Sequence, residues 1–160
     1  GGEDKTSLVM GNGRPFFAKL LSPKKRNVRL AKKSNLNEIM IYDLRKIDHI
    51  PNGSIQFRSK TKMLVSTKNN LSSNKLKKLK QLTDAPIEIT DSNKQYKKRI
   101  YKLKYKKHSL QSFAVEMEAD GGIPIKRLVN GFSVVPNISS ILNTDCFCEK
   151  FDVDQIYLSK

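Results

Sequence analysis

Between residues 99 and 106 lysines and aromatic or aliphatic residues largely alternate, a pattern typical of a β-strand. One set of alternate positions consists of Ile100, Lys102, Lys104 and Lys106, and the other consists of Arg99, Tyr101, Leu103 and Tyr105. Because successive side chains of a strand point to opposite faces, we expect one basic face and a second face with Tyr101 and Tyr105 in the core. A turn at residues 108–109 precedes a second alternating segment at 113–117, which predicts an antiparallel hairpin.

The rest of the chain combines strand-like segments with a few short helices. Leucines recur every three residues within residues 71–82, after a serine that can cap the start, which predicts an amphipathic helix. A second helix is expected after Asn137, whereas residues 123–129 fit either a strand or a short helix. Further strands are expected at residues 14–21, 38–46, 55–57, 62–67 and 147–158. These segments follow no regular βαβ order, so the sequence predicts an α+β fold with a mostly antiparallel mixed sheet and two to three helices.

The net charge of +16 favours a polyanionic partner, because lysine and arginine total 31 against 15 acidic residues. In residues 94–107 eight of fourteen residues are basic and none is acidic. Lysines at alternate positions of a strand stand about 6.5 to 7 Å apart, close to the phosphate spacing of a nucleic acid. We therefore expect the lysine face to bind RNA phosphates through Lys102, Lys104 and Lys106. The alternatives are a basic surface that only confers solubility and an anionic membrane surface, which would require a helix with aromatic anchors.

The cysteines and the hydropathy narrow the cellular setting. No segment approaches the ~20 apolar residues of a transmembrane helix and no signal peptide opens the chain, so we expect a cytoplasmic protein without membrane contact. Cys146 and Cys148 lie two positions apart, which places both thiols on one face of a strand and disfavours a disulfide. With only two histidines in the chain, we expect reduced, buried cysteines and no metal site.

Several short motifs, in order along the chain, resemble one family of RNA-modifying enzymes. Residues 1–4 read Gly-Gly-Glu-Asp and residues 10–16 read Met-Gly-Asn-Gly-Arg-Pro-Phe. The basic element Ser-Pro-Lys-Lys-Arg follows at residues 22–26, and Glu-Ala-Asp-Gly-Gly-Ile-Pro-Ile-Lys-Arg-Leu-Val-Asn-Gly occupies residues 118–131. A closing pair of elements lies at residues 136–142 and 151–153. Together these motifs resemble the archaeal and eukaryotic tRNA pseudouridine synthases that act on the T-loop.

The resemblance implies a role for several residues. Asp4 matches the family's catalytic carboxylate, and Lys126 matches the basic residue beside it, which would keep the carboxylate ionised. Three residues are expected to form the substrate pocket: Ile125, Phe151 and Arg14. Three others join the lysine face in binding RNA: Lys24, Lys25 and Arg26. The reaction needs no metal or organic cofactor, and the target uridine is expected to leave its stack to reach the pocket.

The resemblance also implies what residues 1–160 represent. They match the C-terminal portion of the catalytic domain, so that the N-terminal RNA-binding region and the first catalytic strands are absent from them. The implied partners are tRNA and the missing N-terminal part of the same protein.

Departures from the family pattern leave other functions open. The family has arginine before Glu-Asp where this chain has Gly2, and it has a tyrosine near residues 60–65, where this chain has none. A catalytically silent relative that only binds structured RNA fits these departures. An unrelated basic RNA-binding or ribosome-associated domain would fit the charge alone. The three possibilities differ in whether Asp4 and Lys126 meet in one pocket.

Overall fold

The computed structural model describes residues 7–25, 27, 29–37, 39–50, 52–53 and 55–158, which form two compact units. Unit 1 combines Gly1–Arg14 with Gln56–Lys160, and unit 2 comprises Pro15–Ile55. Asp4 and Arg26 lie outside the described residues. None of the helices in the described part is long and apolar enough to cross a membrane.

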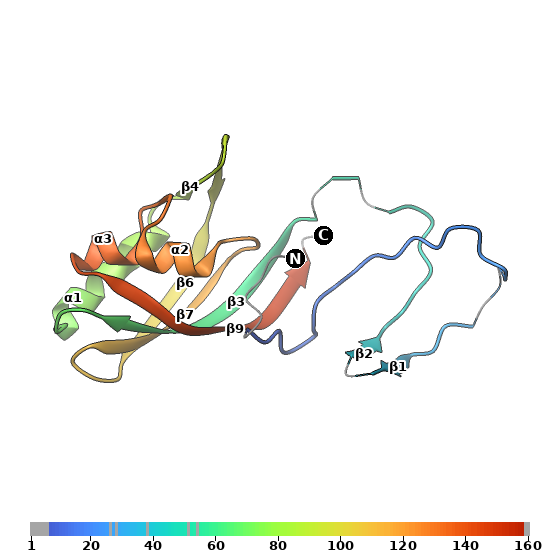
Figure 1. Cartoon of the computed structure of the whole chain (residues 1–160), viewed down its shortest axis with the longest axis horizontal. Helices are drawn as coiled ribbons and strands as arrows, with labels where there is room; N and C mark the ends of the chain where they lie inside the picture. The colour runs from blue at the N-terminus through green and yellow to red at the C-terminus, as the bar shows by residue number, and fades with distance from the viewer. Residues whose placement is uncertain are drawn as a thin grey trace. The chain divides into compact units, whose positions relative to one another are not determined.

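Unit 1 is built on two antiparallel sheets and confirms the α+β class (Figure 1). The larger sheet has the order β6-β7-β3-β9 and consists of β3 (Phe57–Thr67), β6 (Ile100–Lys107), β7 (Ser112–Asp120) and β9 (Cys146–Leu158). The smaller sheet has the order β5-β4-β8 and consists of β4 (Ile87–Asp91), β5 (Lys94–Lys98) and β8 (Val134–Val135). The predicted hairpin is therefore confirmed as β6 and β7, and the two strands expected at 55–57 and 62–67 are one continuous strand, β3.

Short helices cover one face of the larger sheet. They are α1 (Ser73–Lys77), the 3-10 helix η1 (Lys78–Thr83), α2 (Ile125–Asn130) and α3 (Ile138–Leu142). The helix predicted at residues 71–82 is confirmed as α1 followed by η1, with Ser72 accepting a hydrogen bond from the Lys75 amide at its start. The ambiguous segment 123–129 is helical, because α2 begins at Ile125.

The core lies between the larger sheet and these helices. The sheet contributes alternate residues that are at most 3% exposed, among them Met63, Val65, Phe113, Val115 and Met117. The helices contribute Leu79, Leu82, Leu128, Val129, Ile138 and Leu142, which are equally buried. Cys146 is buried in this core and Cys148 packs against it, both as free thiols, and burial raises the pKa of the Cys146 thiol. The opposite face of the sheet, which we call the open face, carries the charged residues of the same strands.

Unit 2 contains a two-stranded hairpin of β1 (Lys33–Leu36) and β2 (Ile39–Tyr42). None of its described side chains is buried. The strand predicted at residues 14–21 is wrong, since those residues form no regular element. Their apolar residues come in adjacent pairs rather than at alternate positions, and Pro15 has no N–H to donate to a neighbouring strand.

A β-bulge in β6 changes which residues point into the core. Ile100 pairs with Ala119 and Lys102 pairs with Glu118, so Tyr101 has no partner on β7. Strict alternation placed Ile100 on the lysine face, yet its side chain is fully buried, so that prediction is wrong. The placement of Tyr105 is confirmed, because it packs against the core together with Leu103. The prediction that Tyr101 lies in the core is wrong, because the bulge turns its side chain toward Asp120 on the open face.

Asn137 is expected to matter for stability because it serves two elements at once. Its side chain accepts a hydrogen bond from the Ser140 amide at 2.8 Å and donates one to the Val134 carbonyl at 3.0 Å. Asn137→Ala should lower the free energy of unfolding by about 1 to 2 kcal/mol, through the lost cap and an unsatisfied carbonyl. Chemical denaturation of this variant and of Asn69→Ala, which removes an exposed side chain, tests it. Equal midpoints for the two variants would contradict the prediction.

Candidate functional site

The chain segment that follows the Gly-Gly-Glu-Asp motif is attached to the edge of β9. Val9 forms a parallel bridge with Val153, supported by hydrogen bonds from the Met10 amide to the Val153 carbonyl and from the Val153 amide to the Leu8 carbonyl, each 2.8 Å long. The Leu8 amide also donates to the Asp152 carboxylate at 3.0 Å. Residues 8–10 thus extend the larger sheet beyond β9.

Asp152 secures this attachment electrostatically. The Leu8 amide, and to a smaller extent Lys150 at 3.3 Å, holds the pKa of the Asp152 carboxyl below its ordinary value of 3.8, against an opposing effect of desolvation. A carboxylate whose pKa is lower in the folded state stabilises the fold above the ordinary pKa. That contribution is lost as the pH falls through the lower folded pKa. The contribution of the Asp152 carboxylate to the attachment of residues 8–10 is therefore present at neutral pH and is lost in acid, whereas the two backbone hydrogen bonds do not titrate.

Removal of this carboxylate should loosen the N-terminal segment. In Asp152→Ala we expect the Met10 amide to exchange with solvent roughly tenfold faster, because the neighbouring bond to Leu8 is lost. Amide hydrogen exchange at neutral pH measures this, with Asp145→Ala, an exposed acid elsewhere in unit 1, as the control. If Met10 exchanged at the same rate in both variants, Asp152 would have no anchoring role.

Helix α2 presents the second group of predicted site residues. Its first residue, Ile125, is 8% exposed and packs in the same core as Phe151, which is 9% exposed on β9. Lys126 follows on the exposed side of the helix. Helix α2, which carries Ile125 and Lys126, packs on β9, the strand that carries Phe151 and to which residues 8–10 are attached. Because Asp4 is outside the described residues, the expected contact between Asp4 and Lys126 stays a prediction.

Two glycines set the entry to α2. The Gly121 amide donates to the Phe57 carbonyl at 2.7 Å, and a Cβ at Gly121 would lie 2.1 Å from the Phe57 ring. Gly122 has a φ of +83°, which favours glycine. The Gly-Gly pair of the motif is therefore needed for close packing against β3 and for the turn that leads into α2.

Arg127 ties α2 to the smaller sheet and was not foreseen from the sequence. Its Nε donates to the Phe132 carbonyl at 3.0 Å, Nη2 donates to the Thr90 carbonyl, and Nη1 lies 3.6 Å from the Asp91 carboxylate. The resemblance assigned no role to Arg127, so it carried no signal for these contacts. Arg127 fixes the outer side of the helix that bears Lys126.

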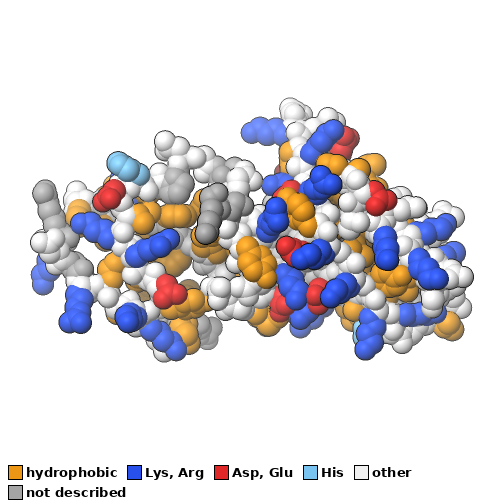
Figure 2. Space-filling model, turned by 180° about the vertical axis from the view of Figure 1, so that it is seen from behind, with side chains coloured by type: hydrophobic (Ala, Val, Ile, Leu, Met, Phe, Trp, Pro, Cys, Tyr) orange, Lys and Arg blue, Asp and Glu red, His pale blue; other side chains and the backbone are white. Residues whose placement is uncertain are grey.

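The open face carries the expected lysines, but acidic residues of neighbouring strands lie among them. Lys102 pairs with Glu118 at 3.2 Å, and Lys60 pairs with Glu116 at 3.1 Å, which raises the pKa of Lys60. Within the described part of the chain Lys104 and Lys106 form no ion pair. Figure 2 shows one side of the molecule, on which lysine and arginine side chains outnumber the acidic ones scattered among them. Strand β6 itself contains no acidic residue, but Glu116 and Glu118 of the neighbouring strand β7 lie beside its lysines.

The remaining predicted RNA-binding and pocket residues are at the surface. Lys24 and Lys25 are exposed in unit 2, and Arg14 is exposed at the boundary of unit 1. Arg26 cannot be placed because it lies outside the described residues.

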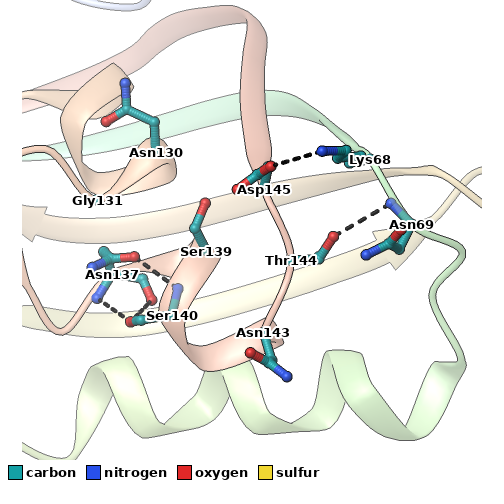
Figure 3. A pocket seen from close by; sticks show the side chains of 10 residues that line it. All are labelled: Lys68, Asn69, Asn130, Gly131, Asn137, Ser139, Ser140, Asn143, Thr144 and Asp145. Atoms are coloured by element: carbon teal, nitrogen blue, oxygen red, sulfur yellow. Dashed lines mark hydrogen bonds and ion pairs between the residues drawn. The ribbon is translucent and has the colours of Figure 1, made fainter.

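A polar hollow of about 700 Å³ lies at the ends of α2 and α3, and none of the predicted site residues lines it (Figure 3). Most of its side chains are amides and hydroxyls, several of which already form structural bonds. The Ser139 hydroxyl, for example, donates to the Val129 carbonyl at 2.9 Å and accepts from the Cys146 amide at 3.0 Å. These groups connect α2, α3 and β9, so the hollow is explained by the fold.

Comparison with known proteins identifies the family. The family model described as "Pus10, C-terminal" matches residues 1–157. The chain is 41% identical over 157 residues to the tRNA pseudouridine synthase Pus10 of Nitrosopumilus maritimus, covering 98% of the chain and 41% of that protein. It is 34% identical over 160 residues to the protein of the same name from Cenarchaeum symbiosum, covering the whole chain and 40% of that protein.

A more distant relative extends the pattern. The tRNA pseudouridine synthase Pus10 of Methanocaldococcus jannaschii is 28% identical over 176 residues, covering 98% of the chain and 38% of that protein. The chain thus spans about two fifths of the length of the curated relatives it matches. This agreement over the whole chain excludes an unrelated basic domain. The chain belongs to the Pus10 family and corresponds to that family's C-terminal region.

Proposed function

We propose that this protein isomerises a T-loop uridine of tRNA to pseudouridine in the cytoplasm. The relatives that it matches are named tRNA pseudouridine synthases. The observation that carries the proposal is the attachment of residues 8–10 to β9, the strand on which α2 packs with Lys126 in its first turn. Asp4 precedes Leu8 by four positions in the sequence.

The chemistry assigns a separate task to each residue. The bond between N1 of uracil and C1′ of ribose breaks, the base rotates, and a bond forms between C5 and C1′. C5 then loses its proton and N1 gains one, so that the product carries a hydrogen on N1. Asp4 acts either as the nucleophile at C1′ or as the base that deprotonates the sugar. Lys126 stabilises the ionised carboxylate, and Ile125 with Phe151 forms the apolar wall beneath the base.

The chain is proposed to form the C-terminal portion of the catalytic domain. The rest of that domain, and an RNA-binding region, would come from the part of the relatives' length that this chain does not match. Lys24, Lys25 and Arg26, together with the open-face lysines Lys102, Lys104 and Lys106, are proposed to hold tRNA phosphates. Base flipping then delivers the uridine to the pocket.

The test is incubation of full-length protein with unmodified tRNA, followed by chemical mapping of pseudouridine. We expect product at a T-loop uridine. The second candidate is a silent relative that binds tRNA without modifying it, which the missing tyrosine and the glycine at position 2 favour. Tight tRNA binding with no product after long incubation would select that candidate and overturn the first.

A further inference from the structure

The bulge in β6 creates a surface feature that the motifs do not include. Ala119 is buried, so its neighbour Asp120 points to the open face, and Arg58 is the residue opposite Asp120 on β3. The Tyr101 hydroxyl donates to Asp120 at 2.8 Å, and the Arg58 guanidinium carbon lies 3.9 Å from the centre of the Tyr101 ring. Tyr101 has therefore joined the open face instead of the core.

Asp120 holds the Tyr101 ring, on which Arg58 stacks, in position. Asp120 accepts the Tyr101 hydroxyl with one carboxylate oxygen and the Arg99 amide with the other, at 2.7 Å. The Asp120 amide donates back to the Arg99 carbonyl at 2.9 Å. These bonds fix Asp120 to the start of β6, and the carboxylate raises the pKa of the Tyr101 hydroxyl. Tyr101 is half-buried, whereas the Arg58 side chain that covers it is exposed.

A planar cation stacked on a fixed ring presents a flat outer surface. Unpaired RNA bases stack on arginine planes and on aromatic side chains. Phosphate-binding groups are available nearby, because Lys102, Lys104 and Lys106 continue along the same face from Tyr101. An RNA strand offers both flat bases and regularly spaced phosphates, whereas the surface of a folded protein does not offer this combination.

We propose that Arg58, supported by Tyr101 and Asp120, is a stacking platform for an unpaired base of the RNA that this protein binds. The base lies on the guanidinium of Arg58, and the lysines of β6 hold the adjoining phosphates. The choice of RNA as the occupant rests on the proposed function, but the platform acts in binding and is separate from the reaction at Asp4. Tyr101 is a positioning residue for Arg58.

The test distinguishes the effect of the planar guanidinium group of Arg58 from the effect of its positive charge. Arg58→Lys keeps the charge but lacks the planar group. With full-length protein and a short single-stranded RNA that carries 2-aminopurine, we expect binding of the wild type to quench the fluorescence. Arg58→Lys should lose the quenching and bind about tenfold more weakly, with an unchanged dependence on salt. Arg99→Lys, which changes an exposed arginine immediately before β6, should behave like wild type.

Other variants and outcomes complete the design. Tyr101→Phe, which keeps the ring, should retain most of the quenching, whereas Tyr101→Leu should lose it. Thermal melting shows whether each variant is folded. Wild-type quenching and affinity in Arg58→Lys would overturn the platform, even if pseudouridine formed normally. Loss of quenching in that variant would support the platform, even if the wild type proved catalytically silent. Failure of the wild type to bind the oligonucleotide would also overturn it and would favour a protein occupant.

Discussion

Asp4→Asn is expected to reduce pseudouridine formation by at least about 10³-fold while changing tRNA affinity by less than about twofold. Asparagine has nearly the same shape as aspartate but can act neither as a nucleophile at C1′ nor as a base. Single-turnover assays of full-length protein with excess enzyme measure the chemical step, and filter binding measures affinity. This separates a lost reaction from lost binding.

A matched variant gives this experiment its control. Asp84→Asn makes the same chemical change at an exposed carboxylate after η1. It should leave both the rate and the affinity at wild-type values. If Asp4→Asn retained more than about a tenth of the wild-type rate, Asp4 would not be the catalytic carboxylate. A large loss of affinity would instead assign it to tRNA binding.

Replacement of Lys102, Lys104 and Lys106 by glutamine should lower the slope of log affinity against log salt by about two to three units. Each phosphate contact contributes roughly 0.7 to 0.9 units, so affinity near physiological salt should fall on the order of 10²-fold. Lys102 is expected to contribute least, because it is already paired with Glu118. The single variants Lys104→Gln and Lys106→Gln should therefore each lower the slope more than Lys102→Gln does.

The control for the triple variant changes the net charge by the same amount on the helices of unit 1. Lys77, Lys78 and Lys80 are exposed in α1 and η1. Their replacement by glutamine should leave the slope within about half a unit of wild type. The slope counts the counterions that lysines displace from RNA phosphates, and lysines that do not contact phosphates displace none. Equal slopes for the two triple variants would remove the β6 lysines from the RNA footprint.

The sequence predicts most of unit 1, because its elements carry local signals. The strand expected near residues 99–106, the leucine spacing before Thr83 and the Asn137 cap all appear as expected. The position of Tyr101 was unpredictable, since a bulge depends on the register between two strands and not on the composition of one. The acids opposite the lysine face were also missed. Glu116 and Glu118 lie in a different segment, and only the pairing of β6 with β7 brings them near Lys102.

The motifs identified candidate site residues, but they did not predict the contacts that position those residues. Helix α2, which carries Ile125 and Lys126, packs on β9, which carries Phe151, but the roles that the resemblance implies for these residues stay predictions. The contacts of Arg127 could not be inferred, because they depend on where the β4 strand ends relative to α2. In unit 2 the pairs of apolar residues gave no reliable period, and a strand was predicted where none forms.

The attachment of residues 8–10 to β9 also imposes an order on biosynthesis. Leu8 and its partner Asp152 are 144 positions apart. At about 5 to 20 residues per second, the ribosome needs roughly 7 to 30 s to make the strand that receives Leu8. The β6–β7 hairpin is complete before β9 emerges, so the lysine-rich surface exists earlier than the scaffold of the acidic motif. During synthesis the proposed RNA-binding lysines are therefore available before the proposed catalytic site can be assembled.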